Sequence, residues 1–518
     1  MISHKALFSK LQDTSLIAKC TTYAHWTLPQ LMADMSITRG LTRALVERDY
    51  QEIGALLTNN LASKLARLLF PGHFAFFKIE ASDAVKAEAE DSGKTTELMS
   101  KLSKLELRAS QRVFKHASYA QLILLLKHLI VTGSAVLYRD SKASKCVVYG
   151  LHSFAIRRDG KGGVLDLVIR EYETFEALPI EIQKFLKSKA PGKYNRAEQI
   201  VEVYTRVHRK QGDAGNVYFE VTQEVDTTPV GTANSYPEHL CPYIAPTWSL
   251  ISGEHYGRGL VEDFAGGFAK LSDLSEAAAL YGIEMMRVIH LVAAGSGTDI
   301  DDIANAETGQ YVRGDPATVQ AHESGDGAKL QQVAGVIEQT TTRLSTAFMY
   351  QGPTRDAERV TMYELQRQAQ EAEYSLGGAY SSLAEGIQVP LACLLMYEED
   401  RNTLAALLST DIKPQISAGL PALGRSADVQ NALLAAQEAA ALVSLSQIDS
   451  RFDPAKLVDL VLAGRSVDAK ALQYDEETME KLAAAENAQQ EGMNQVTQAQ
   501  ADASTLEQLQ QLTGGMPQ

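Results

Sequence analysis

The chain has 518 residues, of which 45% are hydrophobic and 22% are charged. This length suggests three or four domains at roughly 150 residues each, and the composition is typical of a folded chain with a large core. Fibrous, collagen-like and wholly disordered chains are excluded. The four cysteines form no CxxC pair and the eleven histidines form no pair at metal-ligand spacing. We therefore expect reduced thiols, no metal site and no cofactor.

The net charge of -15 is unevenly distributed. Residues 1–250 carry 32 basic and 26 acidic side chains, whereas residues 251–518 carry 17 and 38. An acidic half does not bind a phosphate backbone and suits either a surface that repels DNA or one that binds a basic partner. The N-terminus lacks the apolar core of a signal peptide, and the longest apolar run, residues 122–131, is too short to span a bilayer. We expect a soluble intracellular product with no membrane contact.

Helical periodicity dominates the first 130 residues. Apolar residues at steps of three and four predict a helix from Leu41 to Leu68, which Pro71 and Gly72 end. A charged stretch over residues 86–110 predicts an exposed helix. A further amphipathic helix is predicted over residues 106–131, ending near Gly133.

The period changes to short β-branched runs between residues 135 and 251. Gly, Asp and Asn separate these runs, with turn signals at Asp159-Gly160 and Gly212-Asp213. The pattern predicts an antiparallel, β-rich subdomain of several hairpins.

The remainder is predicted to be mostly helical. Residues 259–293 contain no proline and keep an apolar helical period, which predicts a helix on the order of 50 Å long. A small-residue, acidic segment follows over 295–327, and a second helix over 330–348. After a break at Gly352-Pro353 the helical period resumes at 361–384, with kinks expected at Gly377-Gly378 and Pro390. The Gln-rich tail keeps a weak helical period and needs neighbours to be ordered.

Catalytic motifs are absent from the sequence. It contains no HExxH and no GxSxG, and Gly160-Lys-Gly162 is better explained as a hairpin turn than as a dinucleotide fingerprint. We therefore expect no enzymatic activity. One cluster of acidic residues is interpreted as a solvated loop rather than a cation site, and comprises Asp299, Asp301, Asp302 and Glu307. Arg355 and Arg359 could equally contact phosphate or pair with Asp356 and Glu358.

Several segments, in order along the chain, resemble the portal protein, or head-to-tail connector, of T-seven-like (autographivirus) short-tailed bacteriophages. They are YAHWTLPQLM at 23–32, NNLASKLARLLFP at 59–71, CPYI at 241–244, GEHYGR at 253–258, VEDF at 261–264, ERVT at 358–361 and GLPALGR at 419–425. The second is the closest match. Met362 and Tyr363 depart from the small and acidic residues that the family usually has after Arg-Val-Thr.

The resemblance implies an α+β, mostly α subunit that assembles into a ring. It implies an α/β wing at 1–250 (β-rich over about 135–250), a first stem helix at 251–294, a clip at 295–328, a second stem helix at 329–350, a tunnel loop at 351–360, a kinked wing helix at 361–409, a helical crown at 410–483 and a tail or barrel helix at 484–518. It assigns Arg355 and Arg359 to DNA contact in the channel and the four acidic residues of the cluster to partner docking at the clip. The stem would pack through Phe264, Phe268, Leu271, Leu344 and Phe348.

The resemblance further implies a dodecameric portal at one capsid vertex of the virion, made in the host bacterial cytoplasm, through which the genome is packaged and ejected. Its partners would be the major capsid protein, the terminase large subunit, the tail adaptor, a scaffold protein, internal core proteins and non-specifically bound double-stranded DNA. An acidic channel wall fits this function, because every retained phosphate contact would slow the duplex.

Two other hypotheses remain. An intracellular enzyme with a β-rich core has ordinary composition in its favour, but no catalytic constellation. A helical scaffold or adaptor that binds basic partners through the acidic half explains the charge, but not the ordered series of matching segments.

Overall fold

A computed structural model describes the chain in twelve stretches. They are residues 2–34, 46–72, 75–80, 95–194, 196–212, 216–286, 288–295, 299–313, 315–323, 327–350, 362–399 and 415–418. The chain divides into two compact units, Met1–Asp83 with Met99–Gly424, and Ala84–Leu98 with Arg425–Gln518. Nearly all described residues belong to the first unit.

The N-terminal part is helical, as predicted. Its elements are α1 (His4–Leu11), α2 (Thr14–His25), η1 (Pro29–Met32), α4 (Ile53–Leu69), α6 (Thr95–Gln111), η2 (Arg112–Phe114) and α7 (Ser118–Thr132), with the short strand β1 (Phe77–Glu80) between α4 and α6. Two boundaries were predicted wrongly. The leucine-rich helix was predicted to begin at Leu41, but residues 46–52 are not helical and the helix begins at Ile53. The amphipathic stretch after residue 106 is two helices, since His116 (φ 52°) and Ala117 (φ 58°) adopt a left-handed backbone that cannot continue a helix.

The β-rich region is confirmed as two antiparallel sheets. Its strands are β2 (Val136–Asp140), β3 (Lys145–Tyr149), β4 (Phe154–Arg158), β5 (Val164–Thr174), β6 (Ile200–Gln211), β7 (Val217–Val225), β8 (Thr228–Pro237) and β9 (Tyr243–Ile244). Three strands pair in the order β3-β2-β9, and five in the order β4-β5-β6-β7-β8. Short 3-10 turns follow at η3 (Leu151–Ser153), η4 (Phe175–Ala177) and η5 (Glu238–Leu240), and a helix that we did not predict, α8 (Ile180–Lys189), lies between β5 and β6.

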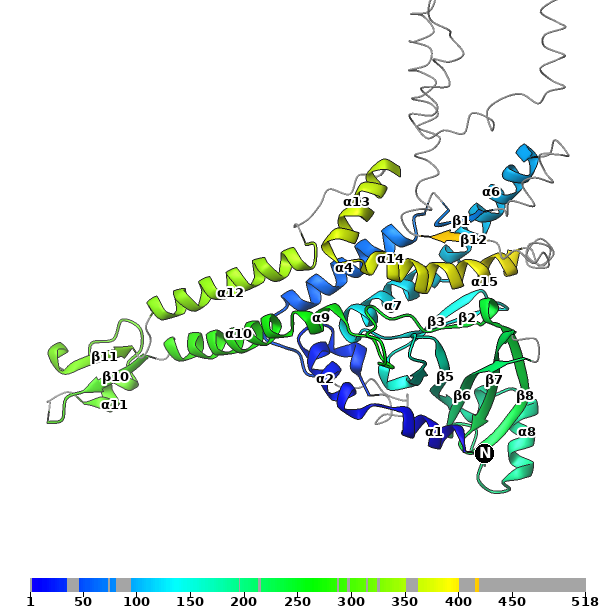
Figure 1. The fold of residues 1–518 in the computed structure, drawn as a ribbon. Coiled ribbons are helices and arrows are strands. Elements are labelled where there is room, and N and C mark those ends of the chain that lie inside the picture. The colour runs from blue at the N-terminus through cyan, green and yellow to red at the C-terminus, as the bar shows by residue number, and fades with distance from the viewer. Residues whose placement is uncertain are drawn as a thin grey trace, which may run out of the picture. The chain divides into compact units, whose positions relative to one another are not determined.

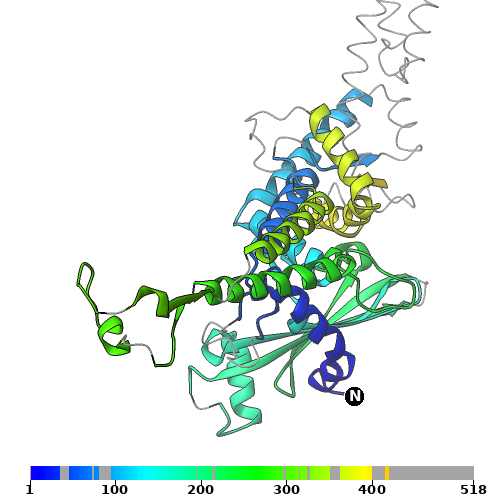
Figure 2. The ribbon, with the colours of Figure 1, turned by 90° about the vertical axis from the view of Figure 1, so that its left-hand side faces the viewer.

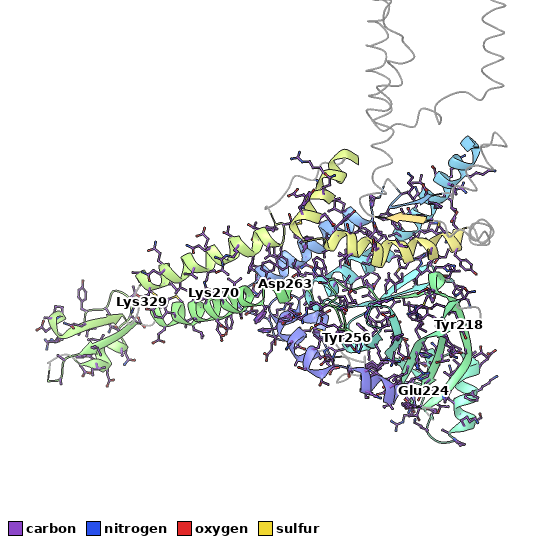
Figure 3. All side chains as sticks on the ribbon, viewed as in Figure 1. Tyr218, Glu224, Tyr256, Asp263, Lys270 and Lys329 are labelled. Carbon is purple, nitrogen blue, oxygen red and sulfur yellow. The ribbon has the colours of Figure 1, made fainter. Side chains whose placement is uncertain are left out.

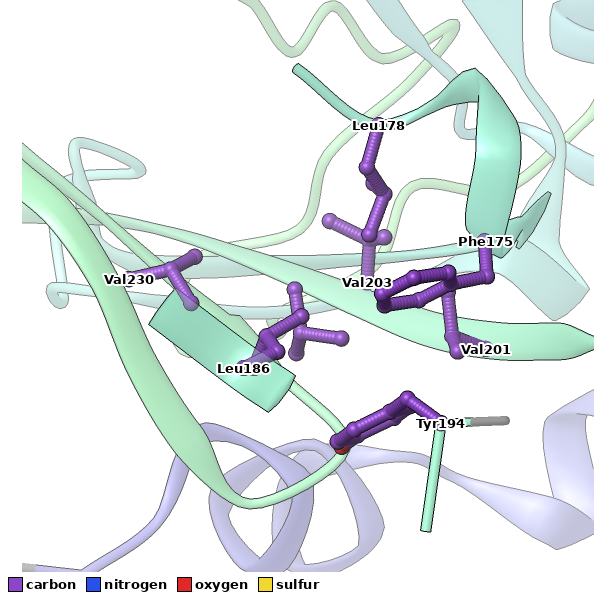
Figure 4. Packing of buried hydrophobic residues seen from close by; sticks show 8 residues of the cluster. Phe175, Leu178, Leu186, Tyr194, Val201, Val203 and Val230 are labelled. Atoms are coloured by element: carbon purple, nitrogen blue, oxygen red, sulfur yellow. The ribbon is translucent and has the colours of Figure 1, made fainter. Parts of the chain in front are cut away.

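Helices cover both faces of the five-stranded sheet. Phe8 of α1 packs on Val168 and Tyr204 at one face. Val203 is the neighbour of Tyr204 on β6, so it points to the opposite face, where it packs in the cluster that contains Leu186 of α8. Figure 4 shows this second cluster, in which Leu186 lies among side chains of β6 and β8.

Two long helices leave the sheets side by side, with a β-hairpin at their far end (Figures 1 and 2). The elements are α9 (Leu260–Asp263), α10 (Ala265–Met285), β10 (Val288–Val292), α11 (Ile300–Ala304), η6 (Pro316–Thr318), β11 (Val319–Glu323) and α12 (Gly327–Ala347). The first helix was predicted to reach residue 293, which is wrong. It ends at Met285, and the β-branched run that follows pairs antiparallel with β11.

The helical region after residue 361 is kinked, as predicted. It comprises α13 (Met362–Ser375), α14 (Ala379–Leu383), the π-helical turn η7 (Ala384–Gln388) and α15 (Val389–Glu399), and β12 (Gln415–Ala418) pairs with β1. Gly377 and Gly378 have φ of 61° and 86°, which ends α13. Pro390 follows the π turn, which accommodates a residue that lacks a backbone N–H. By length and composition the run Ala379–Glu399 could cross a membrane, but 61% of its apolar 18-residue window is buried within the chain.

Candidate functional site: the projection and its anchor

The pair α10 and α12, with the β10–β11 hairpin and α11 at its end, is called the projection below. Glycine contacts fix its base on the core. Gly133 ends α7 with φ of 75°, and a side chain there would come within 2.4 Å of the carbonyl oxygen of Gly257. The Gly257 N–H donates to Ser134 Oγ (2.7 Å), and the Trp248 N–H donates to the Gly133 carbonyl (3.0 Å). The backbone that leads into α9 and α10 thus lies directly against the end of α7.

The predicted stem residues meet at the core end of the projection. Phe268 packs edge-on against Phe348, with ring centroids 5.6 Å apart, and Phe264 lies 6.0 Å from the same ring. Phe268, Leu271, Leu344 and Phe348 are buried. A Cβ on Gly267 would lie 3.2 Å from Leu344, so this glycine lets the two helices approach closely. Figure 3 shows Asp263 at the base of the projection and Lys329 near the hairpin.

The hairpin end of α10 exposes apolar side chains instead. Leu280, Ile283 and Met286 are 53%, 63% and 77% exposed. Their spacing of three residues places them along one side of the helix. This row of exposed apolar side chains is a candidate contact surface.

The four acidic residues predicted for docking lie at the end of the projection. Asp299 caps α11, where its carboxylate accepts from the Asp301 N–H at 2.9 Å. Asp301 and Asp302 form the first turn of that helix, and Glu307 follows it. All four are exposed, and Tyr311 nearby is 100% exposed. Within the described ranges no three His, Cys, Asp or Glu side chains are grouped so that they could hold a metal ion.

Some predicted sites lie outside the described residues. These are the tunnel loop with Arg355 and Arg359, the tail, and the crown except for β12. Their assignments stay predictions. The four cysteines are free thiols, three of them buried and Cys393 half-buried.

An ion-pair network that the sequence did not indicate ties α15 to the core. Arg139 on β2 donates from Nε and Nη2 to the two carboxylate oxygens of Glu398, both at 2.8 Å. Both side chains are buried, at 0% and 3% exposure. Burial lowers the pKa of the Arg139 guanidinium, but the hydrogen bonds that it donates to Glu398 and the neighbouring groups raise the pKa by more, so the net shift is upward. Arg112 adds a contact to Glu399 at 2.7 Å.

A buried histidine lies in the middle of α7. His128 is 6% exposed, and its Nδ1 has no hydrogen-bond partner within the described chain. A Cβ on Gly150 would come within 2.6 Å of the imidazole, so the ring fills the space above that glycine. Burial lowers the pKa of His128 from 6.5 to about 4. The ring is therefore neutral at physiological pH and acts as a core side chain.

Comparisons with known proteins show the family of the chain. A family model for bacteriophage head to tail connecting proteins matches residues 5–472. The chain is 44% identical over 503 residues to the portal protein of Pseudomonas phage phiKMV, covering 96% of each chain. It is 30% identical over 495 residues to the portal protein of Enterobacteria phage SP6, covering 94% of this chain and 92% of the relative.

Solved structures give a weaker likeness. A chain in the virion of a native gene transfer agent particle is 9% identical, with a TM-score of 0.32 over 69% of this chain and 85% of that one. A chain in the neck of a native particle computed with C12 symmetry is 10% identical, with a TM-score of 0.30 over 69% and 89%. From the family model and the two portal relatives, the chain belongs to the family of bacteriophage head to tail connecting proteins.

Proposed function

We propose that the chain is the subunit of a ring-shaped portal at one vertex of the capsid, through which the genome is packaged and later ejected. Membership of the connector family and 44% identity to a named portal protein support this function. The observation that carries the ring is the exposed apolar side of α10, since a lone chain would leave Leu280, Ile283 and Met286 in water.

In this proposal the projection is the stem. Closed rotational symmetry joins two different surfaces of neighbouring subunits, so the apolar side of one α10 would meet the stem of the next copy. Phe268 and Phe348 already hold the two helices of one subunit together. Twelve copies are expected.

The channel wall would be acidic. Residues 260–350 contain thirteen acidic and five basic side chains. Such a wall repels the duplex and leaves it free to slide. Arg355 and Arg359 would then form a sparse cationic ring at the narrowest point and contact phosphates without reading sequence.

The hairpin end would be the clip. Asp299, Asp301, Asp302 and Glu307 give it a negative surface that can dock basic protein surfaces, first the terminase and later the tail adaptor. The major capsid, scaffold and internal core proteins would contact other surfaces of the ring.

The mass of the purified assembly tests the proposal. A ring predicts one species of twelve copies, or a closely neighbouring number, of the 56.4 kDa chain. A monomer or dimer at every concentration, with and without scaffold protein, would contradict it.

A further inference from the structure

A basic surface stands out on a chain that is acidic overall. Helix α8 and the loop after it, residues 180–199, carry five cations and only two acidic residues, Glu181 and Glu198. We call these twenty residues the α8 surface. Its five cations are all exposed, and they are Lys184, Lys187, Lys189, Lys193 and Arg196. In Figure 1, α8 lies at the opposite end of the described unit from the β10–β11 hairpin.

Most of these cations form no ion pair with the described carboxylates of the chain. Lys193 pairs with Asp226 at 2.6 Å. The other four have no carboxylate within ion-pair distance among the described residues. Two of them lie over aromatic rings instead: Lys187 Nζ is 5.4 Å from the centroid of Phe175, and Lys189 Nζ is 5.8 Å from that of Phe185. A cation over a ring stays available to an anion on its other side.

The α8 surface is anchored to the five-stranded sheet by buried side chains. Leu186 is fully buried in the cluster on the five-stranded sheet (Figure 4). In the same cluster Phe175 and Tyr194 stack at 5.2 Å with an interplanar angle of 13°. The helix is therefore a fixed platform, and a partner would not have to order it on binding.

Exposed apolar side chains and two hollows lie among the cations of the α8 surface. Ile180 and Phe185 are 68% and 40% exposed. A hollow of about 780 Å³ lies between Lys193, Arg196 and Glu198, and a smaller one of about 240 Å³ is lined by Lys187, Ala190, Gly192 and Tyr194. Each hollow thus has at least one cation in its lining.

We propose that the α8 surface docks an acidic amphipathic segment of another protein. Carboxylates of that segment would pair with the four cations that lack a carboxylate partner, and its apolar side chains would cover Ile180 and Phe185. Exposed apolar groups beside the cations favour a polypeptide over duplex DNA, since a phosphate backbone gains nothing from them. The proposal is independent of the ring and of the channel.

The test measures binding to a synthetic helical peptide with glutamates on one face and leucines on the other, by fluorescence anisotropy, at about 0.1 M salt, where charges more than about 10 Å away are screened. The variant is the triple charge reversal K184E/K187E/K189E. Its matched control is K115E/K142E/K145E, which reverses three exposed lysines elsewhere and gives the same net charge. Three lost exposed ion pairs predict a loss of affinity of about tenfold or more in the variant. The control should bind within about twofold of the original chain.

A second comparison separates the two classes of partner. Phe185→Ser should weaken binding of the amphipathic peptide but not of an all-glutamate peptide without leucines. Duplex DNA should bind more weakly than the amphipathic peptide. Circular dichroism checks that each variant is folded. No peptide binding by the original chain, equal losses in both triple variants, no effect of Phe185→Ser, or tighter binding of DNA would each overturn the proposal.

Discussion

Arg139 and Glu398 are 259 positions apart in sequence, yet they form a two-point ion pair in which both oxygens of the carboxylate are 2.8 Å from guanidinium nitrogens. The pair joins β2 to the end of α15 and is excluded from water. Arg139 also reaches Ser118 Oγ at 3.1 Å. The carboxylate lies near the C-terminus of its helix, where the helix dipole disfavours negative charge, so the arginine offsets an otherwise costly placement.

Breaking this pair should destabilise the chain strongly. Arg139→Met leaves the buried Glu398 carboxylate with only its longer, 3.4 Å contact to Arg112 Nη1, and we expect a loss of about 3–5 kcal/mol in the free energy of unfolding. Adding Glu398→Leu to this variant should recover most of the loss. Arg112→Met is the control. It removes the pair with Glu399 and the 3.4 Å contact to Glu398, but that side chain is 21% exposed and the two-point pair with Arg139 stays, so the loss should cost at most about 1 kcal/mol. Equal effects of the two single variants in denaturant titrations would contradict the account.

His128 should make stability depend on pH in one window. Its pKa is 6.5 when unfolded and about 4 when folded, so the unfolded state binds more protons between these values. Stability should therefore be complete above pH 6.5 and fall as the pH is lowered to 4, by up to about 3 kcal/mol. His128→Gln should flatten that slope in urea titrations at a series of pH values. His116→Asn, at an exposed left-handed position, should leave it unchanged.

The glycine contacts at the base of the projection predict a large effect from one methyl group. A Cβ on Gly257 would lie 2.6 Å from the Gly133 oxygen and 2.7 Å from Thr247, so Gly257→Ala must push two backbones apart. We expect the free energy of unfolding, measured by thermal denaturation, to fall by about 1–3 kcal/mol. Gly160→Ala, where nothing lies within 4 Å, is the matched control. An unchanged stability of Gly257→Ala would show that the backbone segments around Gly133 and Gly257 do not approach so closely.

The two ends of the projection should respond differently to substitution. Phe268→Asp places a charge in the buried contact with Phe348 and should abolish both folding of the projection and assembly. Ile283→Glu, on the exposed side of α10, should leave the secondary structure of the chain unchanged by circular dichroism but reduce assembly in sedimentation experiments. Tyr311→Ser at the hairpin end should affect neither. Normal rings from Ile283→Glu would rule out this side of α10 as the subunit contact.

The tunnel-loop arginines should act on DNA and not on assembly. Replacing both Arg355 and Arg359 with Ala removes the proposed cationic ring. The particles should then package less DNA or lose packaged DNA, although their portals assemble normally. Replacing Arg313, which lies outside that loop, with Ala is the control. Normal packaging and retention by the double variant would show that the loop does not contact DNA in this way.

Local patterns predicted much of the fold. Apolar steps of three and four located α4, α10 and α12, and β-branched runs located the sheets. The strand Val288–Val292 was missed, because a five-residue apolar run that continues a helical period cannot be distinguished from the helix by periodicity alone. Its identity depends on pairing with Val319–Glu323, which local sequence does not encode.

Local spacing predicted some residues of the candidate site but not its long-range contacts. Phe264, Phe268 and Leu271 recur at helical spacing, which marked them as packing residues. Phe264 and Phe268 do contact Phe348, directly after the second helix, and Leu271 is buried. The Arg139–Glu398 pair and the pairing of β1 with β12 gave no signal, because both join segments more than two hundred residues apart. Ordered segments that resemble a family, and not physical patterns, pointed to the portal function.

Electron microscopy of the purified full chain, viewed end-on, tests the central claim most directly. The account predicts rings with twelvefold rotational symmetry and an open central channel wide enough for duplex DNA. Compact particles without a channel, in the presence as well as the absence of scaffold protein, would contradict it.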